Sequence, residues 1–176
     1  MKKLLAIVMT LCLMISVAAF AEESAPFVIK DGITFGMNQK DLTAAFGGAR
    51  YETDVENTHG GVSFIEMELE NQTVNGLQAD VKYLLSDDQL AAVHVDYKEF
   101  PGIYDKVKAT LAEAYGESAP VDTTLLGKGI FAVDDDGRLD DPAECWISGN
   151  VMIILEKDYD GDVDVFLVDL AAAYIK

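Results

Sequence analysis

Alternating aspartates near the carboxyl end of this chain come closest to the spacing of a metal site. They are Asp158, Asp160, Asp162 and Asp164. Carboxylates suit Ca²⁺, but an EF-hand loop also requires Gly at its sixth position and a bidentate Glu at its twelfth. In this run Gly161 is fourth and Asp169 is twelfth. We therefore expect an exposed acidic hairpin and no metal site. The alternative is a small calcium-binding module that uses its acidic hairpin loops, with a second acidic run at 134–141.

Residue types suited to catalysis are sparse. The chain has two histidines, His59 and His94, and neither lies in the H-E-x-x-H pattern of a zinc protease. Cys145 lies in an apolar, strand-like run, which favours a buried structural thiol over a nucleophile. The sequence contains no G-x-S-x-G segment, the pattern that presents a nucleophilic serine. The sequence therefore predicts a protein that is not an enzyme and that needs no cofactor.

Two amphipathic helices are predicted, at 38–46 and 103–115. Gly47 and Gly48 supply a left-handed C-terminal cap for the first helix, and Asn38 can cap its amino end. Gly116 ends the second helix. Period-2 alternation and turn residues predict strands after each helix. These strands cover residues 62–70, 77–85, 90–97, 125–133, 145–148, 151–157 and 163–170. The polar stretch 49–61 is predicted to be a loop.

The order of these elements predicts an α+β fold built from two similar halves. Each half is a helix followed by an antiparallel meander, over residues of about 27–100 and 101–176, and the helices pack on one face of the sheet. Together the halves form a single domain over residues 22–176.

One face of the predicted sheet carries the candidate binding residues. Glu66 and Glu68 alternate with apolar residues in one strand, and His94 and Asp96 do so in another. Because the helices should cover the apolar face, these four side chains are expected on the opposite, solvated face. Tyr159, at a predicted turn, is the exposed aromatic best placed to anchor an interface. We therefore expect a surface that binds another protein.

The first 21 residues predict a signal peptide. Lys2 and Lys3 precede an apolar run over 4–17, and Ala19-Phe20-Ala21 forms an A-x-A cleavage site. We expect an exported protein, either secreted or in the periplasm or cell envelope, without membrane insertion after cleavage. The formal charge of −18 argues against nucleic acid as a partner, because phosphates repel an acidic surface. The surface of the unknown protein partner is expected to be basic.

The stretch from Phe35-Gly36-Met37-Asn38 through Asp41-Leu42 to Phe46-Gly47 resembles the opening of small outer-membrane lipoproteins of the SmpA/BamE type. Those proteins are helix-then-meander domains. A tandem pair of such units resembles the β-lactamase-inhibitor-protein (BLIP-like) fold. The resemblance implies that this chain binds other proteins and catalyses no reaction itself.

Overall fold

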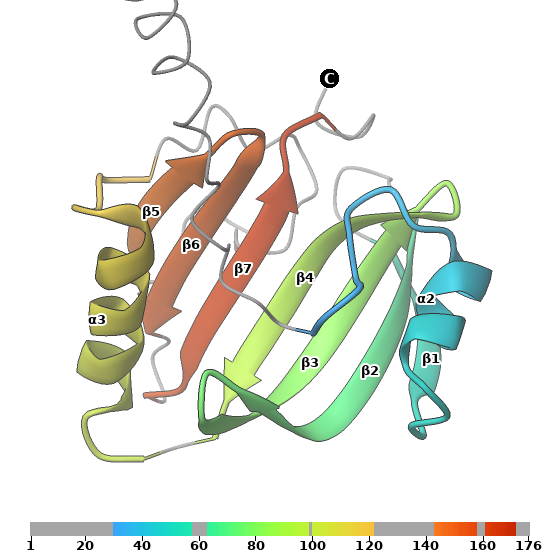
Figure 1. The fold of residues 1–176 in the computed structure, drawn as a ribbon, viewed down its shortest axis with the longest axis horizontal. Coiled ribbons are helices and arrows are strands. Elements are labelled where there is room, and N and C mark those ends of the chain that lie inside the picture. Colours follow the sequence, from blue (N-terminus) through green and yellow to red (C-terminus); the bar gives the residue numbers. More distant parts are fainter. Residues whose placement is uncertain (1–29, 58–62, 99, 122–142, 158–160, 172–176) are drawn as a thin grey trace, which may run out of the picture.

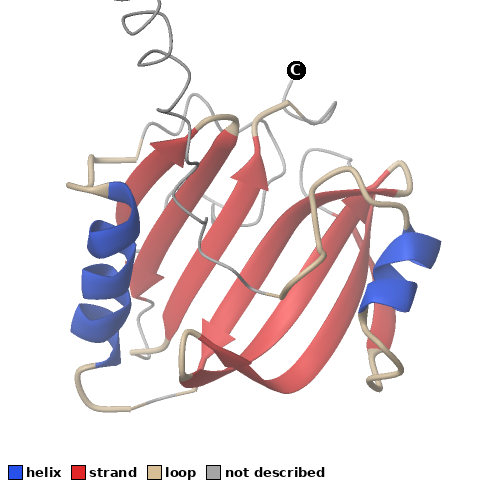
Figure 2. Cartoon of the chain, in the orientation of Figure 1, coloured by secondary structure: helices blue, strands red, loops and turns tan. Residues whose placement is uncertain are grey.

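The computed structural model describes residues 30–57, 63–98, 100–121, 143–157 and 161–171. Within these ranges the chain forms two helices and a seven-stranded antiparallel sheet, so the protein is α+β (Figures 1 and 2). The helices are α2 (Gln39–Ala45) and α3 (Ile103–Tyr115). The strands are β1 (Glu52–Asn57), β2 (Ser63–Val74), β3 (Leu77–Ser86), β4 (Gln89–Tyr97), β5 (Ala143–Ser148), β6 (Val151–Lys157) and β7 (Val163–Asp169). Their order across the sheet is β1-β2-β3-β4-β7-β6-β5.

Local turn chemistry explains why consecutive strands pair. At the β3–β4 turn Asp87 and Asp88 have φ values of 51° and 60°, and at the β2–β3 turn Asn75 and Gly76 have φ values of 50° and 78°. Positive φ at both central residues is the requirement of a two-residue hairpin whose twist matches the strands. The strands predicted at 77–85, 90–97, 151–157 and 163–170 are confirmed, and each observed strand begins and ends within one residue of its prediction.

The two helices begin and end close to where the sequence places them. The Asn38 side chain accepts a hydrogen bond from the Asp41 amide at 2.9 Å, which caps α2. Gly47 takes φ of 65° just after α2, as a left-handed C-terminal cap requires. Gly116 ends α3 differently, with φ of 86° and ψ of −153°, and its amide donates to Ala112 O at 2.9 Å.

The predicted loop at 49–61 is wrong, because β1 lies inside it. Residues Glu52–Asn57 pair with β2 in a continuous antiparallel register, from Glu52 opposite Glu68 to Asn57 opposite Ser63. β1 is at the edge of the sheet, where polar and charged residues are common and apolar alternation is weak. β2 also runs four residues past its predicted end, through a register shift between Leu69 and Gln72.

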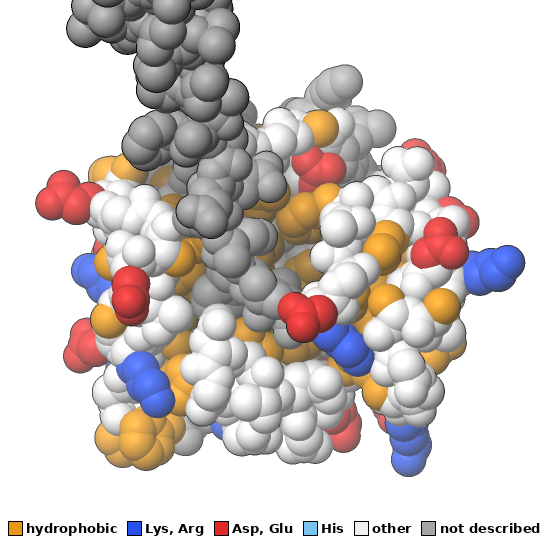
Figure 3. Space-filling view, in the orientation of Figure 1, with side chains coloured by type: hydrophobic (Ala, Val, Ile, Leu, Met, Phe, Trp, Pro, Cys, Tyr) orange, Lys and Arg blue, Asp and Glu red, His pale blue; other side chains and the backbone are white. Residues whose placement is uncertain are grey.

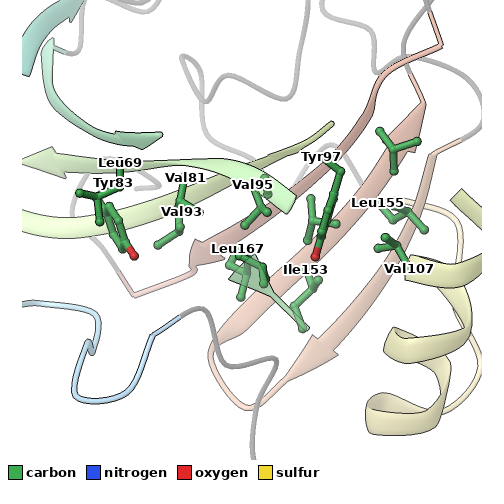
Figure 4. Close-up of a cluster of buried hydrophobic side chains, with 14 of the residues drawn as sticks. Leu69, Val81, Tyr83, Val93, Val95, Tyr97, Val107, Ile153, Leu155 and Leu167 are labelled. Atoms are coloured by element: carbon green, nitrogen blue, oxygen red, sulfur yellow. The ribbon is translucent and has the colours of Figure 1, made fainter. Parts of the chain in front are cut away.

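The main core lies on one face of the sheet, beneath both helices. α2 contributes Leu42 and Phe46, and α3 contributes Val107 and Leu111, all at most 3% exposed. Alternate strand residues complete this core; Figure 4 labels Leu69, Val81, Tyr83, Val93, Val95, Tyr97, Ile153, Leu155 and Leu167. The helices stand at opposite ends of the sheet, so they leave its middle between them (Figure 1). The α3 side chain Val107 lies beside Leu155 (Figure 4).

Several predictions made from the sequence fall outside the described residues. These are the signal peptide at 1–21, the strand at 125–133, the acidic run at 134–141, and the residues Asp158, Tyr159 and Asp160.

Candidate functional site

The sheet face turned away from α2 and α3, called the far face here, gathers charged side chains from five strands. Strand alternation places them opposite the core residues of the same strands. They are Glu66 and Glu68 of β2, Asp80 and Lys82 of β3, His94 and Asp96 of β4, Glu156 of β6 and Asp164 of β7. Four of the five predicted binding residues, Glu66, Glu68, His94 and Asp96, are therefore on one face.

The expectation that this face is a simple solvated surface is wrong. Glu66 is only 9% exposed, and its carboxylate lies 3.7 Å from the Lys82 ammonium. His94 and Asp96 are half-buried. Neighbours on adjacent strands explain why these side chains are less exposed than expected. Lys82 lies between Glu68 and His94 in the strand register, so these side chains cover one another.

His94 is held on this face by a carboxylate and by an aromatic ring. Its Nε2 atom lies 2.6 Å from Asp164 Oδ1, and its ring stacks on Phe166 with centroids 4.4 Å apart and planes 14° from parallel. β4 and β7 pair so that His94 is opposite Phe166 and Asp164 is opposite Asp96. A carboxylate and an aromatic ring therefore fix both the position and the plane of the imidazole.

Carboxylates occupy directly opposite positions on four neighbouring strands, and we call this set the acid row. It consists of Asp80, Asp96, Asp164 and Glu156. Side chains directly opposite in an antiparallel pair have Cβ atoms about 4.5–5.5 Å apart, and like charges there are destabilising. The acid row therefore concentrates carboxyl groups in a narrow band across the far face, near the end of the sheet where β3 and β7 begin and β4 and β6 end.

The acid row is only partly neutralised by neighbouring bases. Asp80 pairs with Lys98 and accepts a hydrogen bond from the Asn71 amide at 2.7 Å. Burial alone would raise the pKa of Asp80, but these hydrogen bonds outweigh it and lower the pKa. At Asp96 the balance is reversed: burial and the neighbouring Asp164 carboxylate raise its pKa, against a smaller effect of His94. A cation placed beside Asp96 would therefore favour its ionised form.

Sequence reasoning missed Asp80, Lys82 and Glu156. Alternation within β3 could have placed Asp80 and Lys82 on the far face, since both lie between core residues. Their alignment with Asp96 and Glu156 depends on which strands are neighbours. The pairing of β4 with β7 joins residues about 70 positions apart, as in His94 and Asp164, and no local pattern specifies it.

The far face turns apolar beside the acid row. Leu84, Ala92, Met152, Ile154, Phe166 and Val168 lie there, and each is at most 4% exposed. In the middle of the sheet both faces are therefore buried, which explains the nearly continuous apolar runs of β6 and β7. At the polar end of the far face Glu68, Lys82, His94 and Asp96 are partly exposed.

A second ionic cluster lies on the helix-covered side and joins α3 to β5. Glu144 accepts hydrogen bonds from Tyr104 Oη at 3.0 Å, Lys108 Nζ at 2.5 Å and Ser118 Oγ. Burial would raise the pKa of Glu144, but the bonds from Lys108, Ser118 and Tyr104 outweigh it and lower the pKa. All four groups belong to one satisfied network, so we assign it to the packing of α3.

Two of the four aspartates in the possible calcium run can be located. Asp164 lies within β7 and contacts His94, and Asp162 is exposed just before that strand. Within the described ranges no group of three or more acidic, histidine or cysteine side chains is arranged to hold a metal ion.

Comparisons with protein-family models, curated proteins and solved structures find no match. In the described part of the chain no helix is long and apolar enough to cross a membrane.

Proposed function

We propose that this chain is an exported, non-enzymatic protein-binding module whose far face contacts a basic surface of its partner. The observation that carries the proposal is the acid row, and above all Asp96 within it. Directly opposed carboxylates oppose folding, and a group with a raised pKa among like charges is a recognised mark of a functional site. A partner's Lys or Arg placed over Asp96 would relieve that repulsion by forming a charge-assisted hydrogen bond.

The neighbours of His94 support binding rather than catalysis. An imidazole held by a carboxylate can act as a general base, but it then needs a hydroxyl, thiol or water to activate. The strand register gives His94 the far-face neighbours Lys82, Phe166, Ala92 and Asp96. None of these four side chains carries a hydroxyl or thiol that the imidazole could activate. Stacked on Phe166, the imidazole offers a flat polar surface to a partner instead.

The strand order supports the proposal that the chain consists of two similar halves. α2 is followed by a meander ending in β4, and α3 by a meander ending in β7, and these two last strands pair at the centre of the sheet. A tandem, BLIP-like arrangement of two helix-plus-meander units has this form. It gives a broad sheet face, which suits a protein partner better than a small molecule.

Location and charge are the remaining parts of the proposal. Removal of a signal peptide over residues 1–21 would leave a mature chain in the periplasm, in the cell envelope or outside the cell. The formal charge of −18 favours encounter with a basic partner through long-range attraction.

A capture experiment with matched variants tests the proposal. The chain without residues 1–21 is immobilised and exposed to an envelope and secreted extract of its source, alongside a Glu68→Lys, Asp96→Asn variant. The control variant, Glu113→Lys with Glu117→Gln, makes the same change in charge at two exposed positions, one in the last turn of α3 and one just after the helix. We expect a protein that is retained by the wild type and the control and lost by the far-face variant. If every captured protein responds equally to both variants, net charge alone governs capture and the proposed face is wrong.

A further inference from the structure

His94 lies beside the acid row and is the only histidine within the described ranges. Histidine is the side chain whose ordinary change of charge falls between about pH 5 and 8. The side chain of His94 is 20% exposed, so it can exchange protons with water. Its charge state therefore sets part of the net charge of the far face near neutral pH.

The hydrogen bond to Asp164 determines which ring nitrogen of His94 gains and loses the proton. An ionised carboxylate can only accept, so the 2.6 Å contact between Nε2 and Asp164 Oδ1 places a proton on Nε2. Nε2 keeps that proton in the neutral and in the charged ring, and the proton gained in acid therefore binds at Nδ1. Because the ring is stacked on Phe166, protonation adds a positive charge at a fixed position on the far face.

The charged groups around this imidazole come from its own strand and from the strands on both sides. β3 places Lys82 directly opposite His94, and β7 supplies the Asp164 carboxylate. The further described groups, most of them acidic, are Glu68 of β2, Asp80 of β3 with its partner Lys98, Asp96 of β4, Glu156 of β6, and Asp162 just before β7. An imidazolium at this position therefore offsets carboxylates that a basic partner would also contact.

The alignment of carboxyl groups distinguishes the far face from the helix-covered side. On the helix-covered side, acidic and basic side chains are dispersed around the margin (Figure 3). In the acid row, four carboxyl groups lie at directly opposite positions on neighbouring strands. A cation that docks on this row therefore comes close to the position where His94 carries its own charge.

We propose that His94 regulates the proposed far-face site by proton linkage: docking of a basic segment expels the Nδ1 proton into solvent, and acid releases the segment. The regulation rests on the proposed function, because it acts on that same site. A partner's ammonium or guanidinium group at Asp96 would lie in the same band as the imidazolium, and a nearby like charge disfavours the charged form of a base. The coupling is reciprocal, so protonation of His94 weakens binding by the same factor.

Calorimetric titration of the chain without residues 1–21 with a hexalysine peptide, capped at both ends, tests the linkage directly. Lysine side chains keep their charge at about pH 6.5, because their ordinary pKa is about 10.4. Any proton released therefore comes from the protein. Titrations at this pH in phosphate and in bis-Tris, two buffers with different ionisation enthalpies, give the number of protons released. We expect release of a fraction of one proton per bound peptide. A binding enthalpy that is the same in both buffers would overturn the proposal, and this measurement needs no variant.

A histidine variant then assigns the proton. His94→Gln keeps an amide that can donate to Asp164 but cannot gain a charge. Between about pH 7.5 and 6.0 the affinity of the wild type for the peptide should fall by up to about tenfold, the change that corresponds to one unit of pKa. This fall should be absent in His94→Gln and retained in the control His59→Gln, which removes the other histidine of the chain. Equal falls in the wild type and His94→Gln, or a fall that disappears in His59→Gln, would contradict the assignment.

The far-face variant separates this regulation from the site on which it acts. If the peptide does not bind at all, or if Glu68→Lys, Asp96→Asn and the control Glu113→Lys, Glu117→Gln weaken its binding equally, both the site and its regulation are wrong. If the far-face variant loses more affinity than the control, but His94→Gln keeps the pH profile of the wild type, the site stands and only its regulation by His94 is wrong.

Discussion

Asp96 is the residue on which the functional argument rests. Its carboxylate lies between those of Asp80 and Asp164 in the strand register, and those two have close basic partners in Lys98 and His94. The raised pKa of Asp96 follows from burial and from Asp164. A site that favours protonation of its own carboxyl group is one at which an external cation can replace the proton.

This environment predicts a stability change when Asp96 loses its charge. A carboxyl whose pKa is raised on folding destabilises the native state once pH exceeds that pKa, and has no such effect below its usual value of 3.8. Asp96→Asn should therefore raise the melting temperature at pH 7, and the gain should disappear as pH falls below about 3.8. Thermal melts across pH measure it, with Glu113→Gln as the control. A lower melting temperature at pH 7 would show that ionised Asp96 stabilises the fold.

Glu144 predicts the opposite pH dependence. Its pKa is lowered by Lys108, Ser118 and Tyr104 against the effect of burial. Its contribution is present above its usual value of 4.5 and is lost as pH falls through the lower, folded value. Glu144→Gln should lower the melting temperature at pH 7, and the two proteins should converge in acid. A difference that persists unchanged below the folded pKa would assign the effect to shape rather than to charge.

At the scale of elements, the most secure parts of the fold are those specified by local chemistry. The cap at Asn38, the glycines after both helices and the aspartates of the β3–β4 turn are visible in the sequence, and the structure has each in its expected role. β1 could not be found in this way, because an edge strand needs only backbone pairing on one side. The far-face neighbours of His94 were also beyond local reasoning, because they depend on the pairing of β4 with β7.

α3 carries the clearest prediction at this scale. Leu111 is 0% exposed and lies in the core beneath the helix. Leu111→Ala should lower the free energy of unfolding by about 2–5 kcal/mol, through lost burial and the cavity that remains. Lys106→Ala, on the exposed side of α3, should change it by about 0.5 kcal/mol or less. Urea denaturation measures both. Equal effects of the two substitutions would show that α3 does not pack through Leu111.

At the scale of the whole molecule, the two sides of the sheet differ in composition and burial. The helix-covered side holds the main core, and the far face carries a mostly half-buried band of charged side chains next to a buried apolar region. A sheet that is buried on both faces in its middle is rigid, and a rigid support favours a binding surface because little order is lost on association.

We also predict that calcium has no effect on the stability of the folded protein. Asp164 is engaged with His94, and the run from Asp158 to Asp164 lacks the ligand order of an EF-hand loop. Addition of millimolar CaCl₂ should leave the melting temperature unchanged. A rise that is abolished by Asp160→Asn with Asp162→Asn would make the calcium-binding module the better interpretation.

The affinity of the captured partner at two salt concentrations tests the central claim most directly. Calorimetric titration compares the wild type, the Glu68→Lys, Asp96→Asn variant and the Glu113→Lys, Glu117→Gln control. Glu66 is left unchanged because it is buried beside Lys82, so its reversal would disturb the fold. Exposed charges are screened within about 8–10 Å at 0.1–0.15 M ionic strength. We predict that affinity falls as salt rises, and falls further for the far-face variant than for the control. An affinity that depends on neither salt nor the far-face substitutions would contradict the account.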